Sequence, residues 1–304
     1  VGSTLNVHDL TLNIGGTRLL LDALLTEFPT LEASRIKLLV SGDEIEQFRE
    51  LIGIKGVATG PFQLSGKLDA SPEGLELLQV ALETSLGQFM LTGTVGPPPT
   101  FIGSKLDVHL DGVNANAVMS VFGIDMLPEQ AFNLNTGVEV VENGLLIERG
   151  VLVTKENERL EVDGFVALGS GSKGSDFKLN ISGKHLAQVL KRHLGNVNVP
   201  DKPYELSGRV QIREAGIGLE DMSFAFEAIQ LKADGLVKLN DQLSGTVLDF
   251  EINGENLSSL SQFQAIGNSL DMFVTGQPYQ AAGHFTVEPN GWKLNKVNGR
   301  IGQT

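Results

Sequence analysis

Apolar and polar residues alternate with a period of two over long parts of the chain. Between Tyr204 and Ile212, and again between Leu248 and Asn253, every second residue is apolar and most of the others are polar or charged. Such alternation is typical of antiparallel strands that have one apolar and one solvated face. The short sequences SPEG, VENG, REAG and EPNG separate segments of this kind and predict hairpin turns between them.

The period changes to that of a helix after some of these segments. In LAQVLKRHLG (186–195), the apolar residues Leu186, Val189, Leu190 and Leu194 form one stripe, and Gly195 is a suitable residue to end a helix. DEIEQFRELIG (43–53) has the same pattern, with acidic residues in its first turn, where the helix dipole favours negative charge. Each group of strands is therefore predicted to end in a short amphipathic helix.

The strand pattern is repeated along the chain. PFQLSGKL (61–68) resembles PYELSGRV (203–210), and weaker copies occur in AFNLNTGV (131–138) and PYQAAGHF (278–285). The starts of these four segments are 70, 72 and 75 residues apart. Glycines recur at the same spacing after the first strand (Gly74, Gly144, Gly216, Gly291) and at the end of the fourth (Gly42, Gly112, Gly183, Gly254). Similarity at a fixed period indicates a repeat protein with units of about 71 residues.

These patterns predict a mainly β protein. We expect an elongated, curved antiparallel sheet that forms a groove, with four to five strands and one short helix in each repeat. The expected units are a partial repeat at 1–60, repeats at 61–130, 131–202 and 203–277, and a partial repeat at 278–304, all in one continuous groove. Because both ends fall inside a unit, we also expect this chain to be a fragment of a longer one.

One helix per four strands is too little to cover the apolar side of such a sheet, and exposed apolar surface commonly marks a binding site. The alternation selects the residues that we expect to line the groove: Phe62, Leu64, Leu68, Phe89, Leu91, Leu106, Val108, Leu110, Leu179, Ile181, Tyr204, Leu206, Val210, Ile212, Phe224, Phe226, Leu248, Phe250 and Ile252.

Composition narrows the classes of function. The 304 residues carry a formal net charge of −14, which disfavours binding to nucleic acid, and they include no cysteine, which excludes thiolate metal sites and cysteine nucleophiles. The five histidines lack the spacing of metal ligands. GSGSKGS (169–175) does not match a phosphate-binding loop, and no nucleophile elbow is present. We expect neither an enzyme nor a bound cofactor or metal.

The repeated unit P-[FY]-x-L-S-G-[KR]-[LV], followed by a turn with glycine, a strand with central glycine and a strand that leads into a helix, resembles the AsmA family. More broadly it is similar to the repeating β-groove proteins of lipid transport, which include TamB-like proteins. The similarity extends over nearly all of the chain.

This resemblance implies a periplasmic region of an inner-membrane-anchored protein in a Gram-negative bacterium. The expected partners are phospholipids, the inner membrane through an anchor that this chain lacks, and outer-membrane components. The expected function is to move phospholipids between the two membranes. A periplasmic scaffold or spacer that transports nothing, or an outer-membrane assembly factor of the TamB type, is the alternative.

Overall fold

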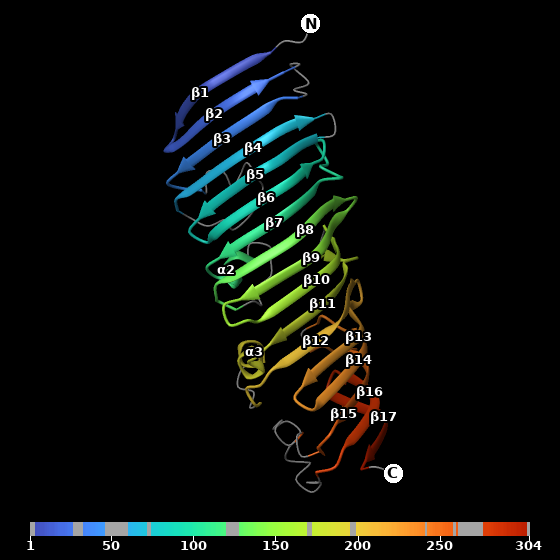
Figure 1. Ribbon diagram of the computed structural model, residues 1–304. Coiled ribbons are helices and arrows are strands. Elements are labelled where there is room, and N and C mark those ends of the chain that lie inside the picture. The colour runs from blue at the N-terminus through green and yellow to red at the C-terminus, as the bar shows by residue number, and fades with distance from the viewer. Residues whose placement is uncertain are drawn as a thin grey trace. The chain divides into compact units, whose positions relative to one another are not determined.

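The computed structural model describes residues 4–26, 33–45, 60–71, 74–119, 128–168, 172–194, 199–240, 242–257, 260 and 276–302. Its contacts divide the chain into two compact units, Val1–Lys155 and Glu156–Thr304. Figure 1 shows the strands and the two helices of the described residues.

Unit 1 is an antiparallel meander in which each strand pairs with the next one in sequence. Its elements are β1 (Leu5–Ile14), β2 (Thr17–Leu25), β3 (Arg35–Gly42), β4 (Phe62–Ser71), β5 (Gly74–Thr84), β6 (Gly87–Val95), β7 (Lys105–Gly112), α2 (Ala115–Met119), β8 (Phe132–Val141) and β9 (Gly144–Thr154).

Unit 2 has the same kind of meander. Its elements are β10 (Arg159–Ala167), β11 (Asp176–Gly183), α3 (Leu186–Leu194), β12 (Tyr204–Arg213), β13 (Gly216–Phe226), β14 (Ile229–Val237), β15 (Val247–Gly254), β16 (Tyr279–Glu288) and β17 (Gly291–Ile301). The prediction of a mainly β, antiparallel protein is confirmed. The helix predicted from Leu186 is α3, whereas most of the one predicted at 43–53 lies outside the described residues.

Four strands, β3, β7, β11 and β15, each end at a glycine that is covered by an aromatic ring. At Gly183 a Cβ atom would overlap the ring of Tyr204, its partner on β12, and at Gly112 it would overlap the ring of Phe132. The same arrangement joins Gly42 to Phe62 and Gly254 to Tyr279. All four rings are buried. The ring replaces the side chain that the glycine lacks, so these pairs seal one end of the strands.

The main described core of unit 2 lies at this sealed end. Leu186 of α3 packs there with side chains of the strands and of the segment after β15: Tyr204, Phe226, Ile229, Leu257, Leu260 and Tyr279. Figure 1 shows α3 beside the end of β11 and α2 beside the end of β7. The helices therefore cover the ends of the strands and leave much of their length uncovered.

A buried hydroxyl fixes the loop at the opposite end of the strands. Ser104 Oγ accepts the backbone N–H of Gly96 at 2.9 Å and donates to the carbonyl of Phe101 at 2.6 Å. Ser175 makes the matching bonds to Ala167 and Ser172, and Ser34 and Thr246 accept the N–H groups of Thr26 and Lys238. These four hydroxyl residues are 70, 71 and 71 positions apart. Because each is buried, its bonds hold the loop in one conformation.

Glycines with positive φ allow adjacent strands to approach closely. Gly235 in β14 has a φ of 144°, and a Cβ there would collide with the carbonyl oxygen of Val247 on β15. Gly93 in β6 and Gly164 in β10 are in the same situation. A side chain at these positions would strain the backbone and separate the strands.

We expect Gly235→Ala to lower the free energy of unfolding by about 1–3 kcal/mol, since alanine is strained at this φ. Gly299→Ala in β17 is the matched control, because a Cβ there meets only ordinary contacts and its φ is not positive. Urea unfolding followed by circular dichroism measures both variants. Equal stability of the two would contradict this account of Gly235.

Candidate functional site

The strand register places the apolar residues of each unit on one face. Residues paired directly across two antiparallel strands have side chains on the same side of the sheet. In unit 1, Val40 of β3 pairs with Leu64 of β4, which pairs with Leu82 of β5. Leu82 pairs with Phe89 of β6, and Phe89 with Leu110 of β7. We call this side of unit 1 its apolar face, and the opposite side its polar face.

The same reasoning defines an apolar face in unit 2. Ile181 of β11 pairs with Leu206 of β12, and Leu206 with Phe224 of β13. Phe224 pairs with Leu231 of β14, and Leu231 with Ile252 of β15.

All nineteen residues selected from the sequence lie on the apolar face of their own unit. Those of unit 1 are Phe62, Leu64, Leu68, Phe89, Leu91, Leu106, Val108 and Leu110. Those of unit 2 are Leu179, Ile181, Tyr204, Leu206, Val210, Ile212, Phe224, Phe226, Leu248, Phe250 and Ile252.

These residues differ in how accessible they are. Phe62, Leu110, Tyr204 and Phe226 are buried, at 1–8% exposure, so they belong to the interior and offer no surface to a ligand. The other fifteen are partly exposed. The open part of each apolar face therefore lies between the sealed end of the strands and the loops held by the buried hydroxyls.

β-Bulges explain many of the apolar residues that the alternation missed. In β13, Leu219 pairs with Val210 and Phe224 with Leu206, so the apolar positions change from odd to even numbers between them. Asp221 in this bulge has a φ of 51°, and its N–H donates to Asp234 Oδ1 at 2.7 Å. A search with a strict period of two therefore finds the apolar residues on only one side of such a bulge. Further members of the apolar faces, absent from the predicted set, are Leu77, Val80, Leu82, Leu134, Val138, Leu145, Ile147, Leu152, Ile217, Leu219, Met222 and Leu231. A change of parity was the sequence signal that could have identified the residues next to a bulge, whereas Leu134, Val138 and Leu231 follow the uninterrupted alternation of β8 and β14.

The polar face carries networks of charged and amide side chains. In unit 1, His109 Nδ1 lies 2.5 Å from Asn135 Oδ1, and its Nε2 lies 3.0 Å from Asp111 Oδ2. The bond to Asn135, followed by the influence of Asp111, raises the pKa of His109 above its ordinary value of 6.5. A hydrogen bond from Asn133, assisted by His109, lowers the pKa of Asp111.

In unit 2, the carboxylate of Asp176 accepts two hydrogen bonds from Arg209, at 2.6 and 2.7 Å. This paired bond is the main reason that the pKa of Asp176 is lowered and that of Arg209 is raised. Both residues are partly exposed, so the ion pair adds little to stability. Its clearer effect is to neutralise a cation on the polar face.

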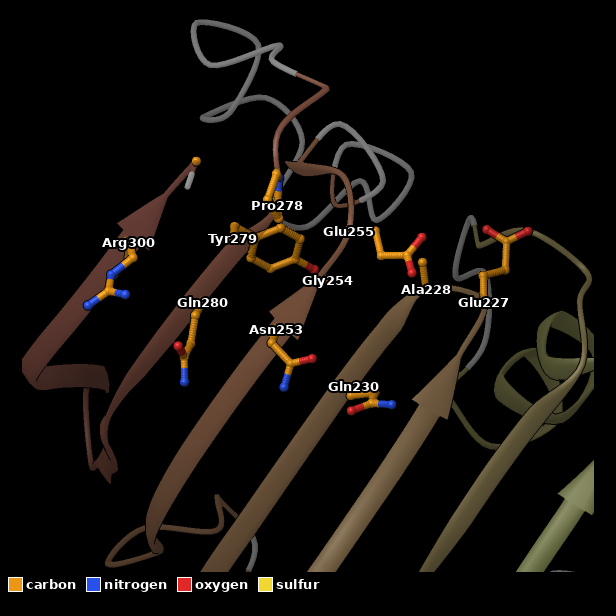
Figure 2. A pocket seen from close by; sticks show the side chains of 11 residues that line it. Glu227, Ala228, Gln230, Asn253, Gly254, Glu255, Pro278, Tyr279, Gln280 and Arg300 are labelled. Atoms are coloured by element: carbon orange, nitrogen blue, oxygen red, sulfur yellow. The ribbon is translucent and has the colours of Figure 1, made fainter. Parts of the chain in front are cut away.

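A hollow of about 610 Å³ lies on the polar face of unit 2. Figure 2 shows Gln230, Asn253, Gln280 and Arg300 side by side on adjacent strands, with Glu255 near the edge of the hollow. The four residues are paired in register from β14 to β17. Their amide and guanidinium groups offer donors and acceptors to a polar ligand. None of the nineteen selected residues lines this hollow.

Within the described residues, no group of three or more histidine, cysteine, aspartate or glutamate side chains is placed to hold a metal ion. No helix among them combines the length and the apolar character that crossing a bilayer requires. Comparison with known proteins found no matching family model, no similar curated protein and no similar solved structure.

The pKa of His109 leads to a test of the network on the polar face. Because the folded state raises this pKa, it stabilises the protonated imidazole. That stabilisation is complete below pH 6.5 and is lost as the pH rises through the raised pKa. We expect an NMR titration to show His109 titrating above 6.5 and Asn135→Ala to move the midpoint down. Ser65→Ala, on another part of the polar face, is the control. An unchanged midpoint in Asn135→Ala would contradict the assignment of the main cause.

Proposed function

We propose that the chain binds the acyl chains of phospholipids on its apolar faces and acts as a periplasmic module of bridge-like lipid transfer between inner and outer membranes. The observation that carries the proposal is the set of fifteen apolar residues that share a face within each unit and remain partly exposed. An apolar surface of this kind, bordered by polar loops, is suited to a hydrocarbon ligand.

The geometry around each open face also supports the proposal. The aromatic rings over the terminal glycines and, in unit 2, the core that includes Leu186 of α3 limit the face at one end of the strands. The bulges and the positive-φ glycines permit each sheet to bend, which would make the apolar face concave. Acyl chains require no fixed polar partner, so a continuous row of Leu, Val, Ile and Phe residues is sufficient for them. We propose no catalytic step and no cofactor.

The repeat organisation remains part of this proposal. Sequence repeats of about 71 residues would each add a segment of one groove along which lipids move. The similarity to AsmA-like and TamB-like proteins, seen in the repeated strand starts, supports this organisation and the periplasmic location. A scaffold of the same architecture would use the repeats only as spacers. Its own side chains would then cover the apolar faces.

We expect phospholipid to remain bound to protein purified from a Gram-negative host, as detected by native mass spectrometry. Leu206→Asp should reduce the bound lipid and the transfer of labelled phospholipid between vesicles. Leu206 pairs with Ile181 and Phe224, and an ionised carboxylate placed among them costs several kcal/mol even after relaxation. Phe250→Asp, on the same face but three strands farther along in β15, should act likewise.

Glu205→Lys is the control, because Glu205 is exposed and lies on the polar face beside Leu206. Asp249→Lys is a less clean control, since Asp249 bonds to His284 at 2.9 Å. Leu206→Trp narrows the apolar face without adding charge. A loss of lipid transfer in this variant would therefore reflect obstruction of the lipid path and not unfolding caused by a charge. If Leu206→Asp and Phe250→Asp stay folded, as circular dichroism would show, and still bind and transfer lipid, the proposed function is wrong. That result would favour the alternative, a scaffold that transports nothing.

A further inference from the structure

Two lysines lie directly opposite each other on the polar face of unit 1. Lys37 of β3 pairs in register with Lys67 of β4. Like charges at such positions repel, and they are normally offset by carboxylates nearby. The two neighbours that continue this row are Asp22 on β2 and Gln79 on β5. Within the described part of the chain, neither lysine side chain forms a hydrogen bond or an ion pair.

Unit 2 contains the same row with its charges balanced. Asp163, Lys178, Arg209 and Glu220 pair in register from β10 to β13. Here the residue opposite the second cation is an acid, and Glu220 lies 3.4 Å from Arg209. Asp176 binds Arg209 as well, through the two hydrogen bonds described above. The two cations of unit 2 therefore have three carboxylates around them.

Unit 1 has no acid at the positions that correspond to Glu220 and Asp176 of unit 2. Gln79 is the partner of Lys67, where Arg209 has Glu220. Arg35 directly follows the buried Ser34, just as Asp176 directly follows the buried Ser175, so a cation occupies the position of that acid. The nearest charge compensation is Asp69, at 4.0 Å from Arg35, together with Asp22, which already accepts the N–H of Asp9. In a chain with a net charge of −14, the three cations Arg35, Lys37 and Lys67 therefore stand against two carboxylates, Asp22 and Asp69, a local excess of one positive charge.

The lysines border a hollow of about 310 Å³ on this polar face. Arg35, Lys37, Lys67 and His8 lie along it, together with the carboxylates of Asp22 and Asp69 and the side chains of Leu24 and Leu78. The two leucines are 37% and 45% exposed, although neither belongs to the apolar face. Leu78 is the extra residue of the bulge in β5, and Leu24 pairs with Arg35. The hollow thus combines three cations and two carboxylates with accessible hydrocarbon.

We propose that this hollow is a binding site for a phosphate-type anion that carries a short apolar group. The phosphate would lie between Lys37 and Lys67, where it replaces the carboxylates present in unit 2, and the apolar group would contact Leu24 and Leu78. Phosphate oxygens accept hydrogen bonds from lysine, and their charge removes the repulsion between the two cations. The site is on the opposite side of the sheet from the proposed acyl-chain surface, so it does not depend on that proposal.

Titration of the whole chain with hexyl phosphate, followed by ³¹P NMR at low salt, tests the site. We expect Lys67→Gln and Lys37→Gln to weaken binding about threefold to fivefold each, the effect of one exposed charge. Gln79→Glu should weaken binding as well, because it supplies the acid that unit 2 has, whereas Gln79→Asn should not. Lys178→Gln is the matched control in unit 2 and should leave the affinity unchanged. All five substitutions are at exposed positions, and urea unfolding checks that each variant folds.

Inorganic phosphate distinguishes the two possible sources of the anion. It should bind to the same lysines but more weakly than hexyl phosphate, because it cannot contact Leu24 and Leu78. Equal affinities would overturn the apolar half of the site and assign it to a free anion. If Lys178→Gln weakens binding as much as Lys67→Gln does, or if Gln79→Glu has no effect, the site as a whole is wrong.

Discussion

The cross-strand register is the constraint on which the other features of each unit depend. A shift of one residue between two strands would move every side chain to the opposite face. Leu206 would then lie on the polar face and Glu205 on the apolar face. The apolar face and the in-register pairs of charged residues on the polar face would be lost together. The register is maintained at both ends of the strands: Tyr204 covers Gly183 at one end, and the hydroxyl of Ser175 fixes the loop at the other. Each bulge between these ends adds one residue to its strand and shifts the alternation of that strand by one position, so the residues beyond it still pair with apolar partners on the same face.

The sequence was sufficient to predict a mainly β, antiparallel protein and the side of the sheet on which the selected residues lie. This worked because strands such as β11, β12 and β15 alternate without interruption, so a period of two is read directly. It failed in part of β5, β9 and β13, where a bulge changes the parity and hides residues such as Val80 and Leu152. The sequence also did not separate open positions from buried ones. Phe224 and Phe226 lie on the same face of β13, but Phe226 is buried in the core at the sealed end, whereas Phe224 packs against that core and stays partly exposed.

The polar faces contain information of a different kind, which depends on pairs of residues and not on single positions. Lys37 and Lys67 are thirty residues apart and are ordinary surface residues when each is considered alone. Their significance comes from the register that makes them neighbours and from the comparison with Lys178 and Arg209. Periodicity identifies a face, whereas charge balance on that face requires knowledge of which strands are paired and at which residues.

The meander has a consequence for how each unit folds. Every described strand within a unit pairs with the strand next to it in sequence, and most connections are short. Little loop entropy has to be lost before each new contact forms, and low contact order is associated with rapid folding. Hairpins such as β12–β13 can form first and then serve as templates for the next strand. A nascent chain could therefore acquire its sheet progressively during synthesis, with no need to wait for distant segments.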